Sequence, residues 1–246
     1  MSEARYRRPR HQTVAVALAA IDGAFLDRAQ CYFGGGTRIV LELGEYRESE
    51  DLDFLCSSRE GYRALRATVT DRSLGAILST PVGLAREVRA DRYGIRTFLD
   101  VGGSKVKMEI VLEGRVEIGG ETCAGIPVPC LDRVSCFAEK FLANADRGGD
   151  EATLGRDAID LAFMLEGWAE VPARQGAAVA RQAYGDVVDR AVKTAAKKLL
   201  DNKAYFKRCV SALSLTDSKT LTAGLARLAA TDWTKQSSHR RRRVKR

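Results

Sequence analysis

Two aspartates, Asp51 and Asp53, lie two positions apart in the segment DLDFL and have the clearest chemical potential in the chain. In a β-strand, residues two apart project to the same face, so both carboxylates should lie together, with Leu52 and Phe54 pointing into a core. Adjacent carboxylates repel each other, and a divalent cation removes that repulsion. Mg²⁺ prefers carboxylates together with substrate phosphate oxygens, so the pair indicates a magnesium site. The alternative is an acidic pair that only faces solvent.

A glycine run, Gly34-Gly35-Gly36, followed by Thr37, precedes the acidic pair. Glycines ahead of a helix let backbone N–H groups approach a phosphate, and the helix N-terminus adds a partial positive charge. The hydroxyl of Thr37 could bind the same phosphate. The alternative is a tight turn in which Thr37 is an ordinary N-cap. The glycine run and an acidic pair 14 residues after Thr37 together describe a site for a nucleoside triphosphate and its metal.

Phosphoryl transfer with two metal ions needs oxygen ligands from a third group. In KVKMEI the apolar residues alternate with polar ones, which puts Glu109 on the polar face of a strand that could lie beside that of Asp51 and Asp53. The alternative for Glu109 is a surface glutamate paired with Lys107.

Further charged residues occur in the second half of the chain. Lys140 lies in SCFAEKFLANADR, and Asp157 and Asp160 are three residues apart, on one face of a following helix. Lys140 could neutralise triphosphate charge, with Asp160 orienting either Lys140 or the base end of the substrate. The alternative is a solvated cluster of salt bridges.

The elements that must position these residues form an α/β half followed by a helical half. The patterns predict a helix over 11–30, a turn at 31–33, a helix over 37–43 capped by Thr37 and ended by Gly44, a strand over 51–55, a helix over 59–72, and strands over 94–101 and 104–112 joined by a Gly-Gly hairpin turn. Residues 114–130 read as strand and linker. Helices are expected over 131–147, 151–167, 173–200 and 203–213, with no strand after Pro129. This organisation predicts a core domain at 1–128, a helical domain at 129–234 and a disordered basic tail at 235–246.

The distribution of positive charge points to a polyanionic partner. The net charge is +8, and residues 235–246 hold seven Lys or Arg and no acid, so the tail could be a flexible phosphate contact or merely a solubilising segment. Residues 174–208 hold nine Lys or Arg against three Asp, which could form a basic wall for RNA beside the cleft or a solvated helix face.

Composition excludes several other classes of protein. With 45% hydrophobic and 29% charged residues among 246, the chain is typical of a globular protein of one or two domains. It has no apolar stretch long enough for a membrane span and no secretory signal, so we expect a cytoplasmic location without a membrane partner. Its six cysteines form no CxxC pair and its two histidines lie near the ends, which disfavours zinc and favours reduced, buried thiols.

The blocks GGGT, RESEDLDF, VKMEIV, EKFLANADR and RDAIDL occur in this order, and the series resembles the AbiEii/AbiGii toxin family of nucleotidyltransferases, which includes the MenT toxins. The match covers roughly residues 30–165, and RxSxDLDF is its most specific part. The resemblance implies a polymerase-β-like α/β (α+β) nucleotidyltransferase core with a mainly helical C-terminal domain. It also implies transfer of a nucleoside monophosphate from an NTP with Mg²⁺, in some members to the 3′ end of tRNA, and a cognate antitoxin partner.

Carried over residue by residue, the resemblance implies three groups of site residues. The catalytic set is Asp51, Asp53, Glu109, Lys140 and Asp160; the nucleotide-binding set is Gly35, Gly36, Thr37, Arg47, Ser49 and Asp157; and the metal ligands are Asp51, Asp53 and Glu109. The family pattern usually has Asp at the third acidic position, so Glu109 reaches one methylene further. Two alternatives remain: an acceptor that is a protein hydroxyl or a small molecule, or a non-catalytic nucleic-acid-binding module with a structural acidic cluster.

Overall fold

The computed structural model describes residues 5–235 of the chain. Its strands are β1 (Cys31–Phe33), β2 (Leu52–Cys56), β3 (Gly83–Ala90), β4 (Gly94–Val101), β5 (Ser104–Leu112), β6 (Gly120–Glu121) and β7 (Cys130–Leu131). The α-helices of the described residues are α1 (Pro9–Ala19), α2 (Gly23–Arg28), α3 (Gly35–Glu42), α4 (Arg59–Ala67), α5 (Arg133–Arg147), α6 (Arg156–Trp168), α7 (Glu170–Tyr184), α8 (Val187–Asp201), α9 (Lys203–Ala212) and α10 (Ser218–Ala230).

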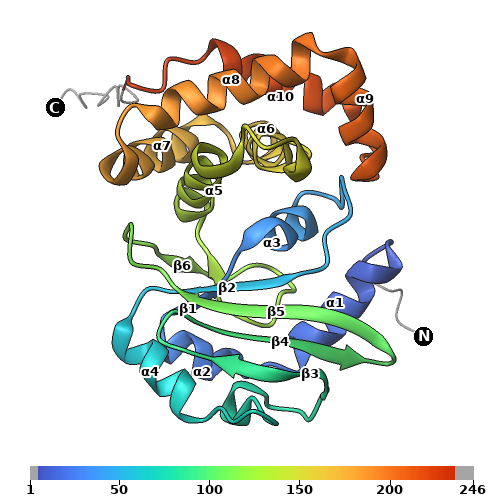
Figure 1. The fold of residues 1–246 in the computed structure, drawn as a ribbon, viewed down its shortest axis with the longest axis vertical. Coiled ribbons are helices and arrows are strands. Elements are labelled where there is room, and N and C mark those ends of the chain that lie inside the picture. The colour runs from blue at the N-terminus through green and yellow to red at the C-terminus, as the bar shows by residue number, and fades with distance from the viewer. Residues whose placement is uncertain (1–4, 236–246) are drawn as a thin grey trace, which may run out of the picture.

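The strands form one seven-stranded sheet in the order β3–β4–β5–β2–β1–β7–β6, and helices lie on both of its faces. Helices α1, α2 and α4 pack on one face, and α3 lies on the other, between the sheet and a layer made of α5 to α10 (Figure 1). One apolar core joins the sheet to α1, α2 and α4, and a second joins α3 to the helical layer. An α/β half followed by a helical half confirms the predicted fold class.

Side chains alternate along the two central strands as the sequence predicts. Leu52 and Phe54 of β2 are buried in the core that α1, α2 and α4 cover, so Asp53 projects to the opposite face. Met108 and Ile110 of β5 are buried in the same core, and β5 lies parallel to β2. The polar residues of both strands therefore share the face on which α3 lies.

The predicted hairpin over 94–101 and 104–112 is confirmed with the same bounds, and Val101 pairs with Ser104 across the turn. Gly102 and Gly103 have φ of +59° and +84°, a left-handed backbone that favours glycine and matches the twist of a two-residue hairpin.

Three N-terminal predictions need correction. The helix expected over 11–30 is two helices, α1 and α2. Asp22 is the N-cap of α2, because its side chain accepts a hydrogen bond from the N–H of Phe25. Residues 31–33 are not a turn but β1, which pairs with both β2 and β7. The third helix begins at Gly35 rather than Thr37, with Gly34 at the N-cap position, so Thr37 lies within the first turn.

Other differences concern the edge of the sheet and the later helices. The helix over 59–72 ends at Ala67, and β3 was not predicted because charged residues on its exposed face obscure the apolar alternation. Gly185, at φ +63°, divides the helix expected over 173–200 into α7 and α8, and α10 was not predicted.

The sheet continues past Pro129, because β7 pairs with β1 and β6, so the expectation of no strand beyond that residue is wrong. Asp132 then caps α5 by accepting a hydrogen bond from the N–H of Ser135. The division of domains at 128/129 stays a prediction. Of the predicted basic tail at 235–246, all but Lys235 lies outside the described residues.

All six cysteines are buried and free, as expected for reduced thiols. Within residues 5–235, no helix combines the length and apolar character that crossing a membrane requires.

Candidate functional site

A cavity of about 300 Å³ lies on the polar face of β2 and β5, roofed by α3 and α5. Eight of the eleven residues singled out from the sequence line it: Gly35, Gly36, Arg47, Ser49, Asp51, Asp53, Glu109 and Lys140. The other three, Thr37, Asp157 and Asp160, are buried behind the lining residues. Residues more than 100 positions apart in the chain thus meet in one site.

Asp51 and Asp53 are carboxylates of the cavity that form no direct ion pair within residues 5–235. Among the described residues, neither side chain takes part in a hydrogen bond or an ion pair, although both face the cavity. Burial, followed by the charge of Asp51, raises the pKa of Asp53 above the usual range of an aspartate. Two unpaired carboxylates in one cavity form a donor set that attracts a cation.

The glycine turn brings the N-terminus of α3 against Asp53. Gly35 has a φ of +67°, and a Cβ at this position would overlap the Asp53 carboxylate. A Cβ on Gly36 would overlap the guanidinium of Arg47, and the N–H of Gly34 donates to the backbone carbonyl of Asp53 at 2.8 Å. Only glycine lets the positive end of α3 lie this close to the acidic strand.

Thr37 and Ser49 lie next to each other, 2.9 Å between the two hydroxyl oxygens. Thr37 is buried and does not line the cavity, whereas Ser49 does. The hydroxyl of Ser49 is therefore accessible from the cavity. The hydroxyl of Thr37 instead contacts Ser49 and helps to hold that side chain in place.

Glu109 lies beside Asp53, because the two residues are register partners on β2 and β5. Its carboxylate accepts hydrogen bonds from Arg96 Nε at 2.6 Å and Lys107 Nζ at 2.9 Å. Burial acts to raise the pKa of Glu109, but Lys107 and Arg96 outweigh it and lower the pKa. The surface pairing with Lys107 and the position beside Asp53 are thus both present. Among the described residues, the oxygens of Asp51, Asp53 and Glu109 are not all within 4.8 Å of one another.

Lys140 and Arg47 are held in place by two aspartates of α6. Lys140 Nζ lies 3.0 Å from Asp157 Oδ1 and 2.6 Å from Asp160 Oδ2. Arg47 contacts Asp160 with Nε at 2.7 Å and Nη2 at 2.8 Å. Burial acts to lower the pKa of Lys140, but Asp160 and Asp157 outweigh it, so the pKa is raised and the lysine stays charged.

Burial would raise the pKa of both aspartates, but the net pKa of each is lowered. Arg47 and then Lys140 lower that of Asp160, and Lys140 and Arg147 lower that of Asp157. Asp157 and Asp160 are therefore anionic and act on the cavity through the cations that they hold.

Four charged residues of the cavity were missed as site residues: Lys107, Glu139, Arg147 and Arg156. The alternation in 105–109, which puts Lys107 on the face of Glu109, could have identified Lys107. Arg147 closes the α6 network by binding Asp157 with Nε at 2.7 Å, a contact made by helix packing that no sequence pattern indicates.

A second group of ligand atoms, from Glu42, Glu121 and Cys123, lies within 4.8 Å. The buried guanidinium of Arg38 contacts all three, reaching Glu121 Oε1 at 2.7 Å and Cys123 Sγ at 3.1 Å. Arg38 therefore already supplies the positive charge of this cluster, so we assign no metal to it.

The overall fold is similar to that of a solved structure assigned as a nucleotidyltransferase. A protein of H. pylori assigned as a nucleotidyltransferase is 16% identical, with 93% of this chain and 94% of that chain covered and a TM-score of 0.53. JHP933 of Helicobacter pylori is 15% identical over 93% and 91% of the two chains, with a TM-score of 0.50. The nucleotidyltransferase toxin MenT4 of Mycobacterium tuberculosis is 14% identical over 91% and 85%, with a TM-score of 0.45. No curated protein matches the sequence.

The family model of the AbiEii nucleotidyl transferase toxin, of type IV toxin–antitoxin systems, matches residues 17–239. The chain belongs to this family, and the protein is a nucleotidyltransferase enzyme.

Proposed function

We propose that the protein is a toxin that transfers a nucleoside monophosphate from an NTP to the 3′ hydroxyl of an RNA, with tRNA as the first candidate acceptor. The observation that carries this proposal is the cavity in which the unpaired carboxylates of Asp51 and Asp53 face the glycine N-terminus of α3 and the charged Lys140. Anionic and cationic groups around one hollow suit a triphosphate and its counterion.

The donor set fits Mg²⁺, since Asp51 and Asp53 offer hard oxygen ligands that form no ion pair among the described residues. Glu109 is the candidate third ligand, and its bonds to Lys107 and Arg96 would have to loosen for it to bind a metal. When bound, Mg²⁺ would offset phosphate charge and lower the pKa of the attacking hydroxyl.

The residues of the chain itself position the substrate. The first N–H groups of α3, at Gly35 and Gly36, bind phosphate oxygens, and the Ser49 hydroxyl donates to the same group. Lys140 and Arg47 offset the remaining charge, and Asp157 and Asp160 fix their positions.

The acceptor oxygen attacks the α-phosphorus, the bond from that phosphorus to the bridging oxygen of the β-phosphate breaks, and pyrophosphate leaves with the electron pair. The proton of the acceptor hydroxyl passes to solvent. Catalysis of this kind depends on positioning and charge neutralisation rather than on a covalent intermediate.

The proposal of an RNA acceptor and of the remaining partners is supported by the charge of the chain and by its family membership. The net charge of +8 favours a polyanion, and a toxin of a type IV toxin–antitoxin system implies a cognate antitoxin. We place the reaction in the cytoplasm, where NTP and tRNA occur together.

The test is incubation of the protein with each labelled NTP, Mg²⁺ and total cellular RNA and protein, followed by separation of the fractions. Label in tRNA, with release of pyrophosphate, is the expected result. Label in protein or in a small molecule would replace the acceptor, and release of no pyrophosphate with any NTP would leave a non-catalytic nucleic-acid-binding module.

A variant pair ties the activity to the cavity. Asp53→Asn should abolish transfer and keep the fold, whereas Asp27→Asn, an exposed aspartate of α2, should change neither. Incorporation of label by Asp53→Asn at the wild-type rate would refute the assignment of the site.

A further inference from the structure

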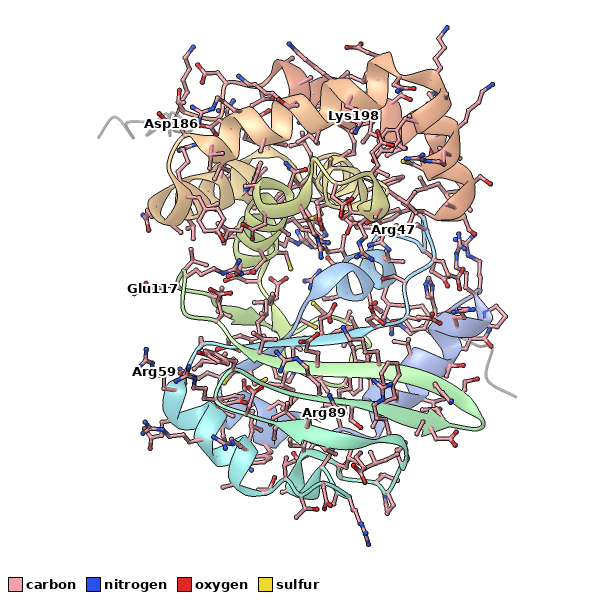
Figure 2. All side chains as sticks on the ribbon, in the orientation of Figure 1. Arg47, Arg59, Arg89, Glu117, Asp186 and Lys198 are labelled. Carbon is pink, nitrogen blue, oxygen red and sulfur yellow. The ribbon has the colours of Figure 1, made fainter. Side chains whose placement is uncertain are left out.

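Basic and aromatic residues extend the catalytic face of the sheet to its free edge. Asp53 pairs with Glu109, Glu109 with Arg96, and Arg96 with Arg89, so these four residues form one row across β2, β5, β4 and β3. Directly opposed residues share a face of the sheet. The row therefore starts at the cavity and ends on the edge strand, where Figure 2 labels Arg89.

A second row runs parallel to the first. Lys107 pairs with Phe98, and Phe98 with Arg86, on the same face. The guanidinium carbon of Arg86 lies 5.2 Å from the centroid of the Phe98 ring. This set of residues, Arg86, Arg89, Arg96, Phe98 and Lys107, is called the strand track below.

The strand track is accessible because the apolar core lies on the other side of the sheet. Ile95, Leu99 and Val106 are buried against α1 on that side. Arg86 and Arg89 are exposed, and the side chains of Arg96 and Lys107 keep 41% and 39% of their surface.

The charges of the strand track are only partly balanced within the protein. Arg96 contacts Glu109 and, at 3.5 Å, Asp91, whereas Arg86 and Arg89 take part in no ion pair among the described residues. Two unpaired guanidinium groups beside a partly exposed aromatic ring suit phosphates and an unstacked base. An acidic protein surface would pair with the arginines but would not stack on the Phe98 ring.

We propose that the strand track binds the single-stranded 3′ end of the RNA acceptor, with Phe98 and Arg86 stacking on a base and Arg89 and Lys107 contacting phosphates. The proposal rests on the function proposed above and specifies where its acceptor lies. Three strand spacings of ~4.8 Å separate β3 from β2, so the track spans roughly 14 Å from Asp53. A short single-stranded terminus that crosses this distance would end with its 3′ hydroxyl in the cavity.

The basic helices expected to form a wall beside the cleft do not compete for this role. No residue of 174–208 lines the cavity, α8 lies on the side of the helical layer away from the sheet, and α9 lies at one end of that layer (Figure 1). These helices can add non-specific attraction for RNA, but the residues that continue the face of Asp53 are those of the strand track.

The first test measures binding of the full-length protein to a 5′-labelled single-stranded RNA oligomer with a free 3′ hydroxyl, by fluorescence anisotropy without NTP or Mg²⁺. Phe98→Ala should weaken binding roughly five- to hundredfold, the loss of one stacked base, and Phe98→Tyr should retain most of the affinity. Arg89→Ala should lower the slope of log K against log salt by about 0.7, one phosphate contact to a single strand. Arg63→Ala, an exposed arginine of α4 on another surface, is the matched control.

The second test separates this inference from the proposed function. In the transfer assay, Phe98→Ala and Arg86→Ala should raise KM for RNA and leave KM for the NTP unchanged. If both variants transfer label with the KM of Arg63→Ala, the strand track is refuted and the proposed function stands. If Phe98→Ala weakens RNA binding but the wild type transfers no nucleoside monophosphate from any NTP, the reaction is refuted and the binding surface stands.

Discussion

Arg47 and Asp160 come from the two halves of the chain and form a buried, two-pronged ion pair, with Nε–Oδ1 and Nη2–Oδ2 distances of 2.7 and 2.8 Å. Asp160 also binds Lys140 and accepts a hydrogen bond from the Tyr46 hydroxyl at 2.7 Å. One carboxylate thus fixes two of the cations that line the cavity, Arg47 and Lys140, and joins the segment after α3 to α6. Because Asp160 does not line the cavity, we propose that it is a positioning residue.

Asp160→Ala should destabilise the protein by about 3–5 kcal/mol, because it leaves Arg47 and Lys140 buried without their shared counterion. Urea unfolding measures the change. Glu166→Ala is the control, since its pair with Arg227 is half-exposed and should be worth less than about 1 kcal/mol. A positioning role further predicts that Asp160→Asn raises KM for the NTP more than it lowers kcat, and equal stability losses in the two alanine variants would contradict the role of the buried pair.

Gly35→Ala should abolish transfer and destabilise the protein by about 1–3 kcal/mol. The φ of +67° strains any other residue, and a methyl group would displace the Asp53 carboxylate. Gly114→Ala is the matched control, because Gly114 is exposed and a Cβ there would meet only open space. Thermal unfolding and the transfer assay on both variants decide the point; an active Gly35→Ala enzyme would show that the close approach is not required.

Asp53→Asn should be more stable than the wild type at neutral pH, although we expect it to be inactive. The raised pKa of Asp53, due to burial and then to Asp51, means that folding favours the protonated form. Its stabilising contribution is present below the ordinary pKa of aspartate and is lost as pH rises through the raised pKa. The difference in unfolding free energy between variant and wild type should therefore grow from pH 4 to pH 7 and shrink when Mg²⁺ is added, because the cation stabilises only the wild-type site.

Glu139 lines the cavity, and its raised pKa leads us to expect a second pH dependence of the unfolding free energy. Burial, and then Glu113, raises its pKa from 4.5 to about 7. Because the folded state holds the proton more tightly, this group loses its contribution as pH rises from about 4.5 to about 7, a loss on the order of 1–3 kcal/mol. Glu139→Gln should remove that part of the pH dependence in urea unfolding.

Glu117→Gln serves as the control for this experiment, since Glu117 is exposed (Figure 2). A wild-type profile that is unchanged in Glu139→Gln would refute a raised pKa at Glu139.

Local patterns in the sequence determined the elements with strict periodicity and the face of each reactive residue. The alternation in 51–56 and 104–112 placed Asp53 and Glu109 opposite the apolar core, and the Gly-Gly pair set the hairpin, because both signals depend only on neighbouring residues. Short or highly charged strands were not predicted from the sequence. Strand β1 has only three residues and depends on β2 and β7 for its hydrogen bonds, and β3 carries arginines on its exposed face.

The tertiary structure alone decided which groups remain free to act. Five carboxylates were predicted from the sequence as site residues, and three of them are paired with cations of the protein. Glu109 binds Arg96 and Lys107. Asp157 and Asp160 bind Lys140 and neighbouring cations. Asp51 and Asp53 keep no such partner among the described residues. Spacing along the sequence indicated the pair of Glu109 with Lys107, two residues away, but not the pairs of Asp157 and Asp160 with Lys140, which depend on how α5 and α6 pack.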